Sequence, residues 1–205
     1  MSKTNENYKI NFMKNLLLAF LLIGVFVYTG CGDDDEDDTR FGEVALRHDG
    51  GNVTGPFLPA GVHEFIVRFD AEELAEYDGR TLDRVEFFLG ELPASISVFV
   101  LEGTDPDSPS DAIYGQDISN RVNTTGWITH RPAEVIEING DRDLWFSIQV
   151  ELDQEQRSVG CDAGPRELGG DLLLRDFDDN IVSFGDITSE SVNWNIRGYL
   201  APEAE

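Results

Sequence analysis

After residue 60, hydrophobic and polar residues alternate along the chain in short runs. The clearest runs are residues 64–69, 84–89, 95–100, 144–152 and 192–198. Successive side chains of a strand point to opposite faces, so each run predicts a strand with one face in a core. Turn-forming residues separate such runs at 49–52, 78–79, 139–141 and 178–180. Roughly eight to ten short strands with this spacing predict an all-β, two-sheet β-sandwich.

One short helical turn is expected at residues 70–74. Asp70 can accept hydrogen bonds from the free amides at the start of a helix. Glu72 and Glu73 suit the positive end of the helix dipole. Little other helix is expected.

The three tryptophans fall on different faces of this pattern. Trp194 shares its strand face with Val192 and Ile196, which predicts a place in the core. Trp145 is out of phase with its hydrophobic neighbours, so it is expected to face solvent or a covering loop. Trp127 follows a Thr-Thr-Gly segment and is expected in a loop or at a strand start. Trp145 and Trp127 are therefore candidate ligand platforms, with local packing as the alternative.

The N-terminus indicates an export signal followed by a lipid-anchor site. Lys3, Lys9 and Lys14 precede an apolar run at 16–28, which is shorter than the ~20 residues of a membrane span. The Thr29-Gly30-Cys31 segment resembles the lipobox of bacterial lipoproteins, in which the Cys is acylated and becomes the new N-terminus. These features predict a signal peptide at 1–30 and lipidation of Cys31. An ordinary signal peptide or an N-terminal anchor helix is the alternative.

Residues 33–38 are all acidic. A block of like charges repels itself, so residues 31–42 are expected to form a disordered tether. An acidic run just after the lipidated Cys also resembles the export signal of Bacteroidetes surface lipoproteins. We therefore expect a lipid-anchored protein of the outer membrane, exposed at the cell surface. A periplasm-facing anchor is the alternative.

The composition excludes some partners. The chain has 15 basic and 40 acidic residues, and residues 1–30 contain three Lys and one Glu. The mature chain thus has 15 − 3 = 12 basic and 40 − 1 = 39 acidic residues, a formal charge of −27. Such a charge argues against binding nucleic acid, and it fits either high salt or bound divalent cations. With Cys31 lipidated, no intramolecular disulfide is expected, and Cys161 is expected to be a small buried residue.

Three stretches match one family in order. They are Leu74-x-x-Tyr77-x-Gly79 leading to residues 98–103, Gly160-Cys161-Asp162-Ala163-Gly164-Pro165 followed by Gly169-Gly170-Asp171, and residues 193–199. Together they resemble the cleaved-adhesin modules of Bacteroidetes, including the haemagglutinin regions of gingipains. The resemblance implies a jelly-roll β-sandwich over residues 43–202, often stabilised by calcium. It also implies binding of proteins, haem-bearing partners or glycans.

Calcium takes six to eight oxygen ligands, which loops rich in Asp and Asn supply. Asp162 and Asp171 flank the Gly-rich loop of the second family motif, and Asp49 and Asn52 lie in another polar turn. These four residues are candidate calcium ligands. The alternative is that short polar side chains cap the turns. Structural calcium would make the melting midpoint fall when excess chelator is added, and an unchanged midpoint would rule it out.

A calcium loop of the EF-hand type is not favoured. Asp176-x-Asp178-x-Asn180 has the spacing that starts such a loop, but Ile181 stands where it needs Gly. The segment is expected to be a hairpin turn.

No catalytic motif stands out. The three His residues are scattered, and the sequence contains no Gly-x-Ser-x-Gly or His-Glu-x-x-His segment. The favoured function is a non-catalytic, adhesin-like surface module that binds an extracellular glycan or protein. One alternative is an accessory structural subunit of an outer-membrane uptake or secretion complex. Another is a glycoside hydrolase or peptidase, which needs two converging carboxylates in a cleft.

Overall fold

The computed structural model describes residues 42–176, 178 and 180–203, which all belong to one compact unit, Asp38–Glu205. The expectations for the signal peptide, Cys31 and the acidic run lie outside the described residues. Within the described part of the chain, no helix has the length and hydrophobicity needed to cross a membrane.

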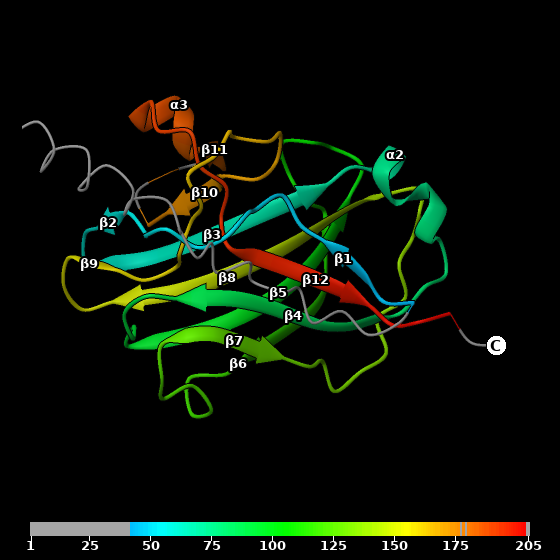
Figure 1. Ribbon diagram of the computed structural model, residues 1–205, viewed down its shortest axis with the longest axis horizontal. Coiled ribbons are helices and arrows are strands. Elements are labelled where there is room, and N and C mark those ends of the chain that lie inside the picture. Colours follow the sequence, from blue (N-terminus) through cyan, green and yellow to red (C-terminus); the bar gives the residue numbers. More distant parts are fainter. Residues whose placement is uncertain (1–41, 177, 179, 204–205) are drawn as a thin grey trace, which may run out of the picture. The chain divides into compact units, whose positions relative to one another are not determined.

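Two antiparallel sheets form the predicted sandwich (Figure 1). The four-stranded sheet has the order β1 (Val44–Leu46), β12 (Ile196–Leu200), β4 (Leu82–Leu89) and β7 (Gly126–His130). The six-stranded sheet has the order β11 (Val182–Ser183), β10 (Leu172–Arg175), β3 (Gly61–Phe69), β8 (Asp143–Leu152), β5 (Ser95–Gly103) and β6 (Asp111–Asp117). A small ribbon pairs β2 (Phe57–Leu58) with β9 (Gln156–Arg157). The all-β prediction is confirmed.

The core lies between the two sheets and takes the residues that the alternation assigns to it. Phe65 and Val67 of β3 are fully buried, as are Val85 and Phe87 of β4. Trp194, just before β12, is fully buried as predicted and packs edge-on against Phe65, with ring centroids 5.1 Å apart. The period-two pattern therefore identified the inner faces of both sheets.

Gly198 of β12 allows the two sheets to approach closely. A Cβ atom at Gly198 would lie 2.2 Å from Cζ of Phe146 on β8. The Phe146 ring thus fills the space that a side chain of β12 would need. This close approach explains why glycine continues the inward-facing series of Trp194 and Ile196.

The predicted helical turn forms as α2 (Ala71–Leu74), followed by the 3-10 turn η1 (Ala75–Tyr77). The Asp70 side chain accepts from the amide of Glu73, and the Glu73 side chain accepts from the amide of Asp70. This reciprocal pair is a capping box, so the expectation for Asp70 is confirmed.

A second helix, α3 (Phe184–Thr188), was not predicted. It contains Gly185 and the β-branched Ile187 and Thr188, which are poor helix formers. Phe184 lies against Trp194, with ring centroids 5.1 Å apart. Tertiary packing of this one side chain therefore outweighs the local preference. The expectation of little helix beyond residues 70–74 is confirmed, although α3 adds one short turn that the sequence pattern did not indicate.

The segment at 176–180 joins the antiparallel strands β10 and β11, as a hairpin turn does. The Asp178 carboxylate accepts from Nε and Nη2 of Arg175 at 2.7 and 2.9 Å. Its oxygens are thus engaged with a guanidinium, which fits the turn and not an EF-hand loop.

We expect Gly198→Ala to lower the free energy of unfolding by ~1–3 kcal/mol, because the added methyl overpacks against Phe146. Gly50→Ala is the matched control, since its Cβ would lie 3.9 Å from the nearest atom, Oδ2 of Asp162. That change is expected to be neutral or to stabilise by up to ~1 kcal/mol. Urea unfolding of residues 38–205 measures both. Equal effects of the two substitutions would contradict the close approach.

Candidate functional site

A buried ion pair joins the turn at Asp49 to strand β12. Nη2 of Arg197 lies 2.9 Å from Oδ2 of Asp49, and Nε of Arg197 donates to Oδ1 at 3.0 Å. The side chain of Asp49 has no exposed surface and that of Arg197 is 5% exposed. Nδ2 of Asn195 donates to Asp49 at 2.7 Å. Burial raises the pKa of Asp49, and the guanidinium and amide contacts oppose this shift.

Asp162 connects the same turn to the Gly-rich loop. Its carboxylate accepts from the amides of Gly50, Gly164 and Asn193 at 3.0, 2.8 and 2.7 Å. It also accepts from Nδ2 of Asn193 at 3.0 Å. Each of the two oxygens accepts two hydrogen bonds, so Asp162 holds together the three chain segments that contain Gly50, Gly164 and Asn193.

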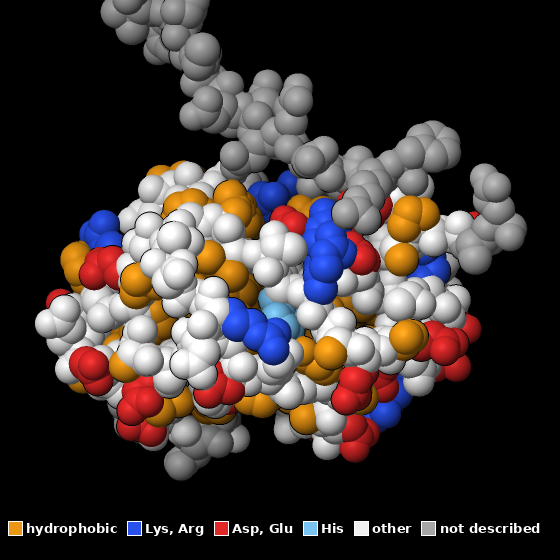
Figure 2. Space-filling model, turned by 90° about the horizontal axis from the view of Figure 1, so that it is seen from below, with side chains coloured by type: hydrophobic (Ala, Val, Ile, Leu, Met, Phe, Trp, Pro, Cys, Tyr) orange, Lys and Arg blue, Asp and Glu red, His pale blue; other side chains and the backbone are white. Residues whose placement is uncertain are grey.

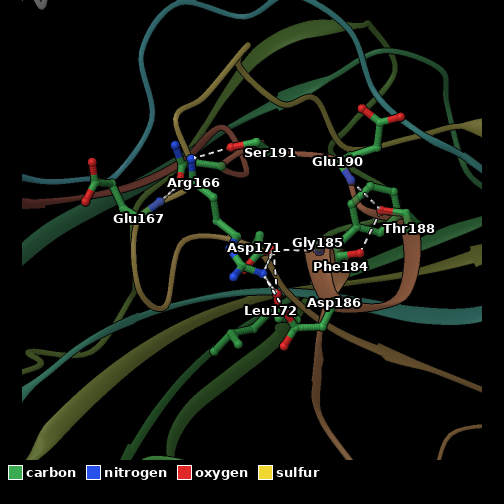
Figure 3. Close-up of polar contacts among 12 residues, drawn as sticks. Arg166, Glu167, Asp171, Leu172, Phe184, Gly185, Asp186, Thr188, Glu190 and Ser191 are labelled. Atoms are coloured by element: carbon green, nitrogen blue, oxygen red, sulfur yellow. Dashed lines mark hydrogen bonds and ion pairs between the residues drawn. The ribbon is translucent and has the colours of Figure 1, made fainter.

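Asp171 lies in a separate cluster beside α3, shown in Figure 3. Its Oδ2 accepts from the hydroxyl of Ser183 at 2.7 Å and from the amide of Gly185 at 2.8 Å. Nη1 of Arg166 is 3.7 Å from the same oxygen and also pairs with Asp186 at 2.8 Å. The cluster fixes the start of α3 onto the end of the Gly-rich loop.

These contacts do not gather the four candidate calcium ligands into one shell. Asp49 and Asp162 share one network, and Asp171 belongs to another. Oδ1 of Asn52 is buried without a hydrogen-bond partner and points at the Cα of Gly160, 2.3 Å from where a Cβ would be. Among the described residues, no group of three or more His, Cys, Asp or Glu is placed to hold a metal ion. The carboxylates therefore do not fit a calcium shell in this arrangement, and calcium binding stays a prediction.

Cys161 is buried, as expected, with 3% of its surface exposed. Burial, aided by the charge of Asp162, raises the pKa of the thiol to about 11. The thiol is then protonated near neutral pH, where a nucleophile needs the thiolate.

Of the two candidate tryptophan platforms, Trp145 is fully buried, so the prediction that it meets a ligand was wrong. The guanidinium carbon of Arg68 lies 5.7 Å from the centre of its ring. The same Arg68 donates to the carbonyl of Pro106 in the β5–β6 connection. The Trp145 side chain faces away from the core, but Arg68 covers it. The sequence could not indicate this, because a strand pattern does not show what packs on the outer face of a sheet.

Trp127 is half-buried at the start of β7. The guanidinium carbon of Arg197 lies 4.2 Å from its ring centre, and Phe88 meets it edge-on. One ring face is thus occupied by a cation. A ligand contact at Trp127 stays a prediction.

The structure brings together residues that the sequence did not single out, at one side of the sandwich where β6 and β7 end their sheets. A cavity of about 350 Å³ opens here. Its lining comes from the β6–β7 connection and from β7 with the residue after it: Ile118, Arg121, Val122, Ile128, Thr129, His130 and Arg131. Figure 2 shows this side, with a His side chain in a recess flanked by basic side chains. We call it the β7 pocket.

One lining residue of the β7 pocket, His130, makes a hydrogen bond to the other sheet. The hydroxyl of Tyr114 on β6 lies 2.8 Å from Nε2 of His130 and donates to Oε1 of Gln116 at 2.6 Å. Burial lowers the pKa of His130, and the nearby charge of Arg121 lowers it further. His130 is therefore neutral near pH 7, and the positive charge of the pocket comes from its two arginines.

The two arginines differ in what they contact. Arg131 pairs with Asp83, whereas Arg121 makes no ion pair with another described residue. Sequence patterns could not find this site, because Arg121 and His130 stand in short, unremarkable polar segments with no motif spacing. Only the meeting of the β6–β7 connection with the edge of β7 places them together.

A larger cavity, about 440 Å³, lies beside η1 and the end of β12. Its lining includes Glu76, Asp78, Arg80 and Glu203. Arg80 donates to the carbonyls of Gly42 and Ala201, and Asp78 accepts from the amide of Gly140. These polar groups tie chain segments to one another, so the cavity is a weaker candidate for a ligand.

No family model matches the chain. No curated protein matches it either. Among solved structures, the clostridial cysteine protease Cwp84, as an alanine variant after propeptide cleavage, matches with a TM-score of 0.58 at 11% identity. A structure of the cysteine protease and lectin-like domains of Cwp84, a surface layer associated protein of Clostridium difficile, matches with a TM-score of 0.58 at 10% identity. Each match covers 80% of this chain but only 41% and 37% of the solved chains. At this identity the likeness shows the fold alone.

We expect Arg197→Met to lower the free energy of unfolding by ~3–5 kcal/mol, because it leaves the buried Asp49 carboxylate without its counter-charge. Arg131→Met is the control, since it breaks the more exposed pair with Asp83 and should cost ~0–1 kcal/mol. The double variant Asp49→Asn/Arg197→Met should lose less than the sum of its single changes. Strict additivity in urea unfolding would show that the pair does not act as a unit.

Proposed function

We propose that this chain is a non-catalytic, surface-anchored module that binds an extracellular ligand in the β7 pocket. The observation that carries the proposal is the contrast between the polar clusters. The carboxylates around Asp49, Asp162 and Asp171 are engaged with protein donors. The β7 pocket, in contrast, is lined by the exposed Arg121 together with hydrophobic side chains, a mixture common in ligand sites.

The chemistry of the described residues supports binding over catalysis. Peptidase chemistry of the cysteine type needs a reactive thiolate, and Cys161 is buried with a raised pKa. His130, the histidine of the pocket, pairs with Tyr114 and not with a nucleophile or a carboxylate.

The fold likeness adds support of a general kind. The solved protein it matches is described as surface layer associated and as having a lectin-like domain beside its protease domain. An all-β chain that resembles part of such a protein suits the display of a binding surface. The motifs that resemble cleaved-adhesin modules point to the same class, with a glycan or a protein as ligand.

The accessory-subunit alternative depends on a hydrophobic docking surface. The large exposed hydrophobic side chains come from separate strands, loops and α3: Val53, Phe57, Leu92, Ile113, Val135, Leu168 and Ile187. Arg157 covers one face of the Phe57 ring, with its guanidinium carbon 4.2 Å from the ring centre. We therefore favour a ligand pocket over a docking face.

For its location we propose a lipid anchor at Cys31 that holds the domain at the outer membrane, on the outer face of the cell. The supporting features are the lipobox-like Thr29-Gly30-Cys31 segment and the acidic run that follows it. Two or more acyl chains make a stable anchor, because each buried methylene contributes ~0.8 kcal/mol.

Binding is tested by applying residues 38–205 to arrays of glycans and extracellular proteins. We expect selective binding that is lost in Val122→Trp, because the larger side chain fills the β7 pocket. Ile187→Trp, on the exposed side of α3, is the matched control and should bind like the parent. A blank array, or a hit that Val122→Trp leaves intact, would contradict the proposed binding site.

The anchor is tested in the full chain with Cys31→Ser. We expect the protein to move from the membrane fraction to the soluble fraction, because the acylated residue is gone. Proteinase treatment of intact cells should degrade the parent protein if the domain faces outward. Membrane attachment of the Ser variant would refute lipidation, and full protection from proteinase would favour the periplasm-facing alternative.

A further inference from the structure

Building on the proposed binding function, we propose that the β7 pocket recognises the carboxylate of a single acidic sugar unit, such as a uronic acid within or at the end of a glycan. The inference rests on the charge, size and lining of the pocket.

The charge of the pocket favours an anion at short range. Arg121 is exposed, lines the cavity and has no ion-pair partner among the described residues, whereas Arg131 is balanced by Asp83. Glu134 is close enough to act on the hydroxyl of Tyr114, but it does not line the cavity. An unpaired guanidinium is the side chain best suited to a carboxylate, which it can hold by two parallel hydrogen bonds.

The acidic surface of the protein does not cancel this attraction. The formal charge of the whole chain is −25. At physiological ionic strength, however, charges separated by more than ~8 Å are largely screened. The charged groups that line the pocket therefore decide whether an anion binds, and Arg121 makes no ion pair with any residue that the structure describes.

The size of the pocket favours one compact unit. Its volume of about 350 Å³ lies near the lower end of ligand pockets, which span roughly 300–1,000 Å³. Two short segments line it, 118–122 and 128–131, so it is a short, open recess and not a long groove. An extended peptide would need a longer track, whereas one sugar ring with its carboxylate fits a recess of this kind.

The lining supplies the two other kinds of contact that a sugar uses. Ile118, Val122 and Ile128 offer hydrophobic surface to the C–H face of a ring. Thr129 offers a hydroxyl, which also donates to Glu86 at 3.3 Å. Because β7 ends its sheet, its outer edge has no strand partner among the described residues, and its backbone amides and carbonyls can bond sugar hydroxyls.

The test follows the backbone amide NMR signals of residues 38–205 during titration with D-glucuronate. We expect shifts confined to residues 118–122 and 126–131. D-glucose, which lacks the carboxylate, should bind at least tenfold more weakly. Arg121→Gln should weaken glucuronate binding at least tenfold, while Arg157→Gln, an equal charge change on β9, should leave it unchanged. Arg121 makes no ion pair with a described residue, so its loss should not impair folding.

Two further probes separate the ligand classes. N-acetyl-leucine, which carries a peptide-type carboxylate, should bind more weakly than glucuronate, and equal or tighter binding at the same residues would overturn the assignment to a sugar. Inorganic phosphate binding as tightly as glucuronate would reduce the site to unspecific anion binding and also overturn it. No response to glucuronate together with an array hit that Val122→Trp abolishes would refute this inference and leave the proposed function standing. No response to glucuronate together with a blank array would refute both this inference and the proposed binding function.

Discussion

The buried pair of Asp49 and Arg197 is the interaction on which the arrangement of the loops depends. It joins a turn near the start of the domain to its last strand, about 150 residues later in the chain. Asn195 and Asp162 extend the contact to the Gly-rich loop. Two charges removed from water are tolerated only when each is fully paired and hydrogen-bonded. Every member of the network is therefore needed to keep the others satisfied.

This constraint explains how an acidic domain can hold carboxylates in its interior. Asp49, Asp162 and Asp171 each sit among arginine, amide or hydroxyl donors. These carboxylates shape loops by accepting hydrogen bonds from protein donors. In the described part of the chain, most of the other acidic side chains lie at the surface. The abundance of Asp and Glu is thus a property of the surface and of the turns, and it does not locate a site.

The proposed binding site lies at the side of the sandwich where both sheets end. β6 and β7 are outermost strands, and a hydrogen bond between His130 and Tyr114 links their sheets. The connection between these strands and β7 together line a recess that includes Arg121. The edge of β7, hydrophobic side chains and an arginine without an ion-pair partner in the described part of the chain meet in one place. The proposed surface location and the proposed ligand both suit a recess that faces outward from a tethered domain.

The sequence by itself determined the class of fold, the inner faces of the strands, the capped turn at Asp70 and the burial of Trp194. Each of these follows from local geometry, because strand periodicity and helix-start chemistry act over a few neighbouring residues. Only the tertiary structure decided the covering of Trp145 by Arg68, the helix held by Phe184 on Trp194, and the partners of the loop carboxylates. The β7 pocket belongs to this second group, since it forms only where residues 118–122 pack beside residues 128–131. Contacts between residues far apart in the chain depend on how sheets and loops pack, and no period or spacing along the sequence records that packing.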